Sequence, residues 1–291
     1  MRSKSVAIRP LKYGHIVPLV RICNQTFLEW ARFPEHGVQA VRLIKEQPAW
    51  QWGAFEGDTL LGFLLCSHRP ERRTVAIKLI GTDPTARGRG IGSLLLARLE
   101  KKAVLTGQET LSVGTPFATG FYEKNGFKLA QTTLRMIRDI AQTSIRLPAS
   151  LSVRPLSMDD APAIVDRLPD GARKHRFLEA FLAAYRQNGR FAVRIEKNRR
   201  LAGVCVGAAD GVYADFARIA LALPIQGAME DVVRGIEYAV SMQGLRHVGF
   251  QMPEAQEALF AKLGYERAAR DYFWTMYTLR KGVRKAENVE R

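Results

Sequence analysis

The segment from Gly81 to Ser93 has the composition of an anion-binding loop. It reads Gly-Thr-Asp-Pro-Thr-Ala-Arg-Gly-Arg-Gly-Ile-Gly-Ser and lies between an apolar stretch and a helical pattern. Successive amides of a glycine-rich loop at a helix start can point at one anion, and the helix dipole adds positive charge there. Arg87 and Arg89 supply further charge. These residues by themselves predict a phosphate or pyrophosphate site.

The spacing of the glycines narrows the class of phosphate ligand. A dinucleotide fingerprint that starts at Gly88 would need its third glycine at position 93, where the chain has Ser93. The Gly-Lys-Ser/Thr of a P-loop is also absent from the sequence. The pattern is instead Arg87-x-x-Gly90-x-Gly92. Both common nucleotide-binding loops are therefore excluded.

A second informative segment follows about one helix and one strand later. Ala118 to Phe127 reads Ala-Thr-Gly-Phe-Tyr-Glu-Lys-Asn-Gly-Phe. It is typical of the last turn of a helix, stopped by Gly126, with an aromatic residue that starts the next strand. Tyr122 lies on that turn.

In this order and spacing the two motifs resemble the GNAT superfamily of acetyl-CoA-dependent N-acetyltransferases. The coenzyme A signature of that family is Arg/Gln-x-x-Gly-x-Gly/Ala, and its closing motif carries a tyrosine near the thioester sulfur. The resemblance covers residues 1–145. It implies a splayed mixed sheet, with acetyl-CoA held in the gap between the strands at 74–82 and 110–113 and no metal.

The resemblance also implies roles for particular residues. Amides near Gly88 to Ser93 would hold the pyrophosphate, and backbone groups near Leu79 to Thr82 would bind the pantetheine and the acetyl carbonyl. The acceptor amine would attack the carbonyl directly, and Tyr122 would protonate the departing thiolate. The cofactor-binding residues expected on this basis are Leu79, Ile80, Thr82, Arg87, Gly88, Arg89, Gly90, Ile91, Gly92, Ser93 and Thr115.

Two departures from the family pattern stand out. Many members carry a glutamate on the strand before the phosphate loop as general base, but residues 75–80 contain no carboxylate. Glu71 and Asp83 flank that strand, and both are typical of solvated loop charges. An asparagine often found before the closing helix is replaced near Thr115. Because the strand before the loop has no carboxylate, we expect the acceptor amine to lose its proton through water or to a base from another part of the protein.

The elements that must position these residues follow from hydrophobic periodicity. A hairpin is predicted from 51–55 and 59–67, turned by Glu56-Gly57-Asp58. An apolar strand at 74–82, a helix from Ser93 to about Gly107 and a strand at 110–113 follow. This order predicts an α+β fold with a mixed, mostly antiparallel splayed sheet flanked by helices.

The chain contains a long internal repeat. Val6 to Leu11 and Leu151 to Leu156 are matching strands closed by proline, and each runs into an amphipathic helix. Phe121 to Phe127 is matched by Leu259 to Tyr265. Two matches in the same order predict a duplication, and they extend the resemblance more weakly over nearly the whole chain. We expect two tandem GNAT-like domains.

The predicted boundaries are 1–140 for the catalytic, acetyl-CoA-binding domain, 141–150 for a linker and 151–291 for a second domain with a basic tail from Arg280. The matching loop at 221–229 lacks the arginine and the paired glycines, and Phe260 replaces the tyrosine. We expect this second domain to be degenerate, serving as a scaffold or as a wall of the acceptor site. Trp30 and Phe33 could line that acceptor site.

Composition bounds the remaining possibilities. The 291 residues carry a net charge of +16, spread over both halves, which favours anionic partners. We find no nucleic-acid motif and expect no specific nucleic-acid recognition. No apolar run could span a bilayer. The 3 cysteines are far apart in apolar surroundings, and the histidines lack metal-ligand spacing. A reducing cytoplasm is the expected compartment.

The leading hypothesis is an N-acetyltransferase that moves acetyl from acetyl-CoA to a small amine or a peptide amine. The basic charge weakly favours an anionic acceptor, and the sequence sets neither the acceptor nor the oligomeric state. The alternative is a non-catalytic coenzyme A-binding regulator or sensor, suggested by the missing strand carboxylate. A tandem aminoacyl-thiol or amino-sugar acetyltransferase ranks lower because its active half is the carboxyl-terminal one.

Overall fold

The computed structural model describes residues 5–26, 35–116, 118–141, 145–186, 190–209, 215–268 and 276–283. The chain divides into two compact units. The first comprises Met1–Thr132 and Met276–Arg291, and the second comprises Thr133–Thr275. Trp30, Phe33 and the linker residues 142–144 lie outside the described residues.

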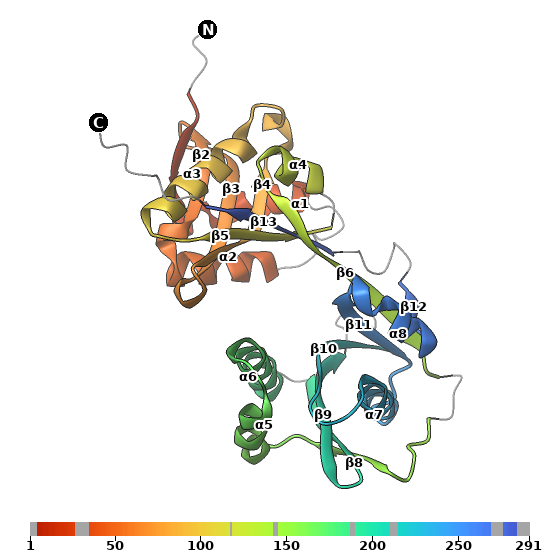
Figure 1. The fold of residues 1–291 in the computed structure, drawn as a ribbon. Coiled ribbons are helices and arrows are strands. Elements are labelled where there is room, and N and C mark those ends of the chain that lie inside the picture. Colours follow the sequence, from red (N-terminus) through yellow and green to blue (C-terminus); the bar gives the residue numbers. More distant parts are fainter. Residues whose placement is uncertain are drawn as a thin grey trace. The chain divides into compact units, whose positions relative to one another are not determined.

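The first unit is a sheet covered by helices on both faces (Figure 1). Its elements are β1 (Ala7–Pro10), α1 (Ile16–Thr26), α2 (Glu35–Glu46), β2 (Gln51–Glu56), β3 (Thr59–Arg69), β4 (Thr74–Thr82), α3 (Ile91–Leu105), β5 (Thr110–Thr115), α4 (Thr119–Lys124) and β13 (Met276–Gly282). The strand order is β1-β2-β3-β4-β5-β13, and only β4 and β5 pair in parallel. The expected α+β class, mostly antiparallel with flanking helices, is confirmed.

Alternation along β3 explains why both faces are covered. Phe63 and Leu65 pack with α1 and α2, whereas Leu64 and Cys66 pack with α3. Successive side chains of a strand point to opposite faces, so a strand that is apolar at consecutive positions must be buried twice. The sheet of this unit is therefore the middle layer of three.

The second unit repeats this plan. Its elements are β6 (Lys128–Asp139), β7 (Leu151–Pro155), α5 (Ala161–Arg167), α6 (Gly171–Arg186), β8 (Arg190–Lys197), β9 (Arg200–Ala209), β10 (Phe216–Pro224), α7 (Met229–Ser241), β11 (His247–Pro253), α8 (Glu257–Lys262) and β12 (Glu266–Arg267). The order is β6-β11-β10-β9-β8-β7, with β12 also on β6. Among the strand pairs formed by the described residues of this unit, β10–β11 is parallel, and it is the counterpart of β4–β5. The predicted duplication is visible in the topology.

The two halves of the sequence exchange their last strands. β6 follows the first half yet pairs with β11, placing Met136 opposite Phe250. β13 ends the second half yet pairs with β5, placing Leu279 opposite Val113. Arg280 to Gly282 therefore form the end of a strand, although their charge pattern predicts the start of a polar tail. The reason is that Leu279 is fully buried and holds these residues in the ladder.

A β-bulge recurs in the first hairpin of each unit. Leu61 is the extra residue between β2 and β3, and Ala202 is the extra residue between β8 and β9. The carbonyl of Leu61 accepts from the amide of Asp83 at 2.8 Å, and that of Ala202 accepts from Ile225 at 2.8 Å. A bulge removes a residue from the ladder, so its carbonyl is available to anchor a loop.

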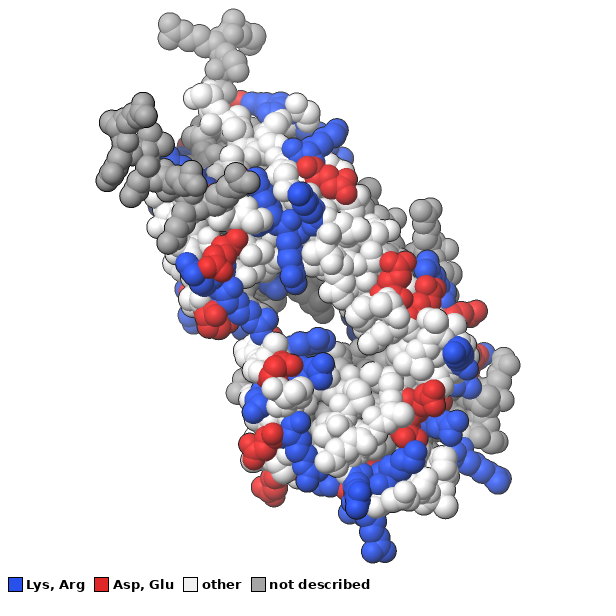
Figure 2. Space-filling view, in the orientation of Figure 1, with Lys and Arg blue, Asp and Glu red and all other residues white. Residues whose placement is uncertain are grey.

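The surface is basic without a basic stripe on the face shown. Lysine and arginine side chains are dispersed among acidic and uncharged ones (Figure 2). In the described ranges, no helix is long and apolar enough to cross a membrane. No group of three or more histidine, cysteine, aspartate or glutamate residues in the same ranges could hold a metal ion.

The three cysteines should be chemically silent in the folded protein. Cys23, Cys66 and Cys205 are free and buried, and burial raises the pKa of the Cys23 thiol to about 12. We expect Ellman's reagent to label none of them rapidly at pH 8 and all of them in guanidinium. Fast labelling of the native protein would contradict this burial.

The same burial predicts a loss of stability at alkaline pH. A thiol whose pKa is raised on folding leaves stability intact below its unfolded pKa and lowers stability as pH rises above it. Each fully buried thiol should remove about 1.4 kcal/mol from the free energy of unfolding at pH 9.5, one unit above its unfolded pKa of about 8.5. Urea unfolding at pH 7.5 and 9.5 measures this, and a triple cysteine-to-alanine variant should show a smaller difference.

Candidate functional site

A cavity of the first unit opens where β4 and β5 separate. Their parallel pairing runs from Thr74 opposite Thr110 to Ile77 opposite Val113. β4 then continues to Thr82 along β3, while β5 continues towards α4. The space between them has a volume of about 960 Å³, which is large enough for a drug-sized ligand.

A second β-bulge marks the point of separation. Leu65 lies opposite Leu79 and Cys66 lies opposite Ile77, so Lys78 is the extra residue of β4. A bulge bends its strand and increases the local twist. The bend explains why β4 leaves β5 directly after Ile77 and why the sheet is splayed there.

The loop after β4 is anchored at its start. The Asp83 carboxylate accepts from the Thr85 amide at 2.9 Å and from the Thr85 hydroxyl at 2.6 Å. These two hydrogen bonds lower the pKa of Asp83. The carboxylate is committed to shaping the turn at Pro84–Ala86, so Asp83 is a structural residue of the loop.

The rest of the loop leaves its amides available. Gly88 and Gly90 have φ of +77° and +73°, a conformation that favours glycine. Within the described part of the chain, no backbone carbonyl accepts from the amides of Gly88, Arg89 or Gly90. The first amides of α3, from Ile91, also lack an earlier helical turn to donate to. This end of the cavity is therefore suited to an anion.

The two arginines of the loop have different surroundings. Arg87 lines the cavity and is exposed. Arg89 does not line it, and its guanidinium pairs with the Glu56 carboxylate of the β2–β3 hairpin at 2.6 Å. Arg87 is the loop cation that can reach a ligand inside the cavity.

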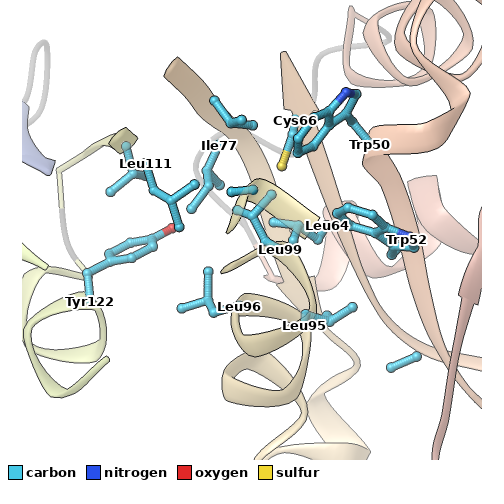
Figure 3. Close-up of a cluster of buried hydrophobic side chains, with 14 of the residues drawn as sticks. Trp50, Trp52, Leu64, Cys66, Ile77, Leu95, Leu96, Leu99, Leu111 and Tyr122 are labelled. Atoms are coloured by element: carbon cyan, nitrogen blue, oxygen red, sulfur yellow. The ribbon is translucent and has the colours of Figure 1, made fainter. Parts of the chain in front are cut away.

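A buried phenol, that of Tyr122, also lines the cavity. The Thr115 hydroxyl accepts from the Ala118 amide at 3.1 Å and starts α4, and the Phe127 amide donates to the Tyr122 carbonyl at 3.0 Å to close it. The Tyr122 side chain is 3% exposed and points from α4 towards Ile77 and Leu111 of the strands (Figure 3). Burial, with a smaller contribution from the nearby Cys66, raises the pKa of the Tyr122 phenol above its usual value. The phenol keeps its proton at neutral pH.

Most of the residues expected at the cofactor site line this one cavity. Arg89 is the exception. The expected residues that line it are Leu79, Ile80, Thr82, Arg87, Gly88, Gly90, Ile91, Gly92, Ser93, Thr115 and Tyr122.

The structure adds lining residues that sequence patterns did not single out. Thr26, at the end of α1, donates its hydroxyl to the Thr82 carbonyl at 3.2 Å. Phe121 packs against Gly92, where a Cβ would lie 2.9 Å from its ring. The Phe121 position was visible beside Tyr122 in the closing motif, whereas Thr26 has no sequence signal because its contact spans 56 residues. The other additions are Ile77, Lys78, Gly81, Ala86, Val113, Gly114, Pro116 and Ala118.

The lining contains no carboxylate. Among the described residues around the cavity, Lys78 and Arg87 are the charged side chains, and Glu71 and Asp83 do not reach it. The described lining therefore offers positive charge to a ligand and contains no acidic side chain that could take up a proton.

The equivalent loop of the second unit is closed by its own hydrogen bonds. It spans four residues, from Ile225 to Ala228, between β10 and α7, whereas eight residues separate β4 from α3. The Ala202 carbonyl accepts from the amides of Ile225, Gln226 and Gly227 at 2.8, 3.3 and 3.1 Å. Glu230 and Asp231 occupy the first turn of α7, where they disfavour an anion. This loop lacks the free amides of its counterpart.

The position of the phenol is also changed in the second unit. Phe260 is buried at 2% exposure and packs against Phe250 and Tyr265. It has no hydroxyl to donate. The second unit thus keeps the packing of the repeat and lacks both chemical features of the first.

A comparison with known protein families matches part of the first unit. Residues 19–127 match the model of the acetyltransferase (GNAT) family. This range runs from α1 past the end of α4 and contains the loop and Tyr122. No curated protein matches the sequence.

Solved structures share the fold of the whole chain. A tandem GNAT protein from the clavulanic acid biosynthesis pathway superposes with a TM-score of 0.70 at 16% identity, covering 97% of this chain and 100% of that one. A GCN5-related N-acetyltransferase from Sphaerobacter thermophilus superposes with a TM-score of 0.69 at 13% identity, covering 96% of each chain. The expected tandem GNAT fold is confirmed.

Proposed function

On the premise that the first unit is a GNAT domain, we propose that the protein transfers an acetyl group from acetyl-CoA to a primary amine. The observation that carries this proposal is that loop residues from Arg87 to Ser93, Arg89 excepted, and the Tyr122 phenol line one cavity between β4 and β5. Acetyl-CoA, which carries both a pyrophosphate and a thioester, could meet both groups in that cavity. The GNAT fold supports acyl transfer in general.

The loop would bind the diphosphate of acetyl-CoA. Amides from Gly88 to Ser93 donate to its oxygens, the α3 dipole favours its charge, and Arg87 adds a charged hydrogen bond. Backbone groups of β4 from Leu79 to Thr82, beyond the end of the pairing with β5, would bind the pantetheine and the acetyl carbonyl. Arg89 acts indirectly by tying the loop to Glu56.

The reaction would proceed by direct attack. The amine nitrogen forms a C–N bond with the acetyl carbon, the C–S bond breaks, and the sulfur leaves with the electron pair. Tyr122 donates its phenolic proton to that sulfur, and solvent restores the proton. Because the lining lacks a carboxylate, the nitrogen loses its extra proton to water. Lys78 and Arg87 suit an acceptor that also carries negative charge.

The test of this proposal is thiol release from acetyl-CoA in the presence of a broad panel of amines, including anionic amino acids and peptides. We expect release that depends on the amine, with the acetylated product detected by mass spectrometry. Tight binding of acetyl-CoA without turnover on any amine would instead support a non-catalytic coenzyme A-binding protein, which the missing carboxylate favours. Absence of binding would reject both functions.

We expect one molecule of coenzyme A to bind per chain. The loop of the second unit donates its amides to Ala202, and Phe260 fills the place of the phenol. Isothermal titration should give a stoichiometry near one. Arg87→Gln should weaken this single binding event, and a second event that survives this substitution would contradict the degenerate role of the second unit.

A further inference from the structure

The second unit contains a basic cavity that the proposed acetyl transfer does not use. Its volume is about 340 Å³. Four cationic side chains line it together with a single carboxylate, that of Glu237. The cations are Arg138 of β6, Arg146 of the segment before β7, Arg234 of α7 and Lys262 at the end of α8.

The carboxylate is already neutralised. Glu237 is 5% exposed, and its Oε1 accepts from the Arg138 guanidinium at 2.8 Å and from the Tyr265 hydroxyl at 2.9 Å. Arg138 also donates to the Leu263 carbonyl at 2.7 Å. Arg146, Arg234 and Lys262 have no ion-pair partner among the described residues. The cavity wall therefore carries three uncompensated positive charges.

The ion pair between Arg138 and Glu237 has a counterpart in the first unit. There, the Lys281 ammonium of β13 pairs with Glu100 of α3 at 2.7 Å and lies over Gly126. Arg138 pairs with Glu237 and lies over Gly264 in the same way. The ion pair between the last strand and the long helix is thus a repeated structural feature.

The other cations that line the cavity do not all have a cation at the equivalent position of the first unit. When Glu100 and Glu237 are aligned, Arg234 corresponds to Ala97 of α3. Lys262 corresponds to Lys124, the last residue of α4. The second unit therefore has an additional cation, Arg234 of α7, beside the ion pair that both units share. Packing does not require a charged residue there, because alanine occupies the equivalent position.

We propose that this cavity binds a phosphoryl group, either as inorganic phosphate or as a small phosphate monoester. Arginine presents planar donors that suit the oxygens of phosphate, and three uncompensated cations match a dianion. A cavity of about 340 Å³ admits a small phosphorylated metabolite. The site is separate from the loop of the first unit, so it does not depend on the proposed acetyl transfer.

The test is isothermal titration of the full chain with inorganic phosphate at low ionic strength, where screening is weak. Arg234→Gln should weaken the binding about tenfold, as expected for the loss of one charged hydrogen bond. Arg146→Gln combined with Arg234→Gln should abolish it. The matched control is Arg167→Gln, which removes an exposed cation of the same unit outside the cavity.

The loop of the first unit could also bind phosphate. The Arg87→Gln variant distinguishes binding at that loop from binding at this cavity. Binding that persists in Arg87→Gln and is lost in the Arg146→Gln, Arg234→Gln double variant supports the proposal. Binding lost only in Arg87→Gln, or no binding at millimolar phosphate, overturns it. Titration with glucose 6-phosphate then distinguishes the sources, since a monoester that binds more tightly than phosphate identifies a metabolite.

Discussion

Replacing Tyr122 with phenylalanine is expected to lower kcat for acetyl transfer about 100-fold, the lower end of the usual contribution of general acid catalysis. The phenyl ring still fills the space among Ile77, Leu111 and Phe127, so the fold should be retained. The KM for acetyl-CoA should change little, because the proposed diphosphate site is formed by the loop and α3 and does not include the phenol. Steady-state kinetics by thiol release, with Tm as a check on folding, measures both quantities.

The control for this substitution is Tyr277→Phe. Tyr277 lies on β13 and packs against the same core without lining the cavity. It should leave kcat unchanged. If Tyr122→Phe keeps the wild-type kcat on every acceptor that is turned over, the phenol has no part in the reaction.

The raised pKa of Tyr122 predicts how kcat should depend on pH. Burial disfavours the phenolate, so the phenol remains protonated beyond its ordinary pKa of about 10. The thiol of the leaving group, with a pKa near 8.5 for ordinary thiols, is the stronger acid. In the proposed reaction Tyr122 would therefore stabilise the developing thiolate by a hydrogen bond before it gives up the proton. We expect no fall in kcat from this group between pH 7 and 10.

The second large effect is expected from Gly90→Ala. Gly90 has φ of +73°, and an L residue in this conformation costs about 1–2 kcal/mol. The variant loop would spend less time in the binding conformation, and the Kd of coenzyme A should rise about tenfold or more. A Cβ at this position has no neighbour within 4 Å, so a packing clash does not contribute. Isothermal titration with coenzyme A measures the change.

Gly57→Ala is the matched control for the loop. Gly57 turns the β2–β3 hairpin with φ of +60°, also has open space around its Cβ position, and does not line the cavity. Both variants should lose similar stability, but only Gly90→Ala should lose affinity. Equal affinity of the two variants for coenzyme A would show that the loop amides do not bind it.

Local patterns in the sequence were sufficient for the parts of the site that depend on neighbouring residues. The stop at Gly126 takes the expected conformation, with φ of +83°, and the glycines at 88 and 90 lie in the expected loop before a helix. Such features are governed by steric limits and hydrogen bonds within a few residues. The pattern of apolar residues likewise predicted the hairpin of 51–55 and 59–67 and the strand at 74–82, because side chains that are buried on a sheet must be apolar.

The sequence by itself therefore determined a duplicated α+β chain with a glycine-rich loop between a strand and a helix and with a tyrosine in the closing motif. Only the tertiary structure decided that Arg89 faces Glu56, that Thr26 reaches Thr82 and that each half contributes its last strand to the other unit. Those contacts join segments tens to more than a hundred residues apart. They depend on where a bulge bends β4 and on which strand edge is open, and no local spacing records either.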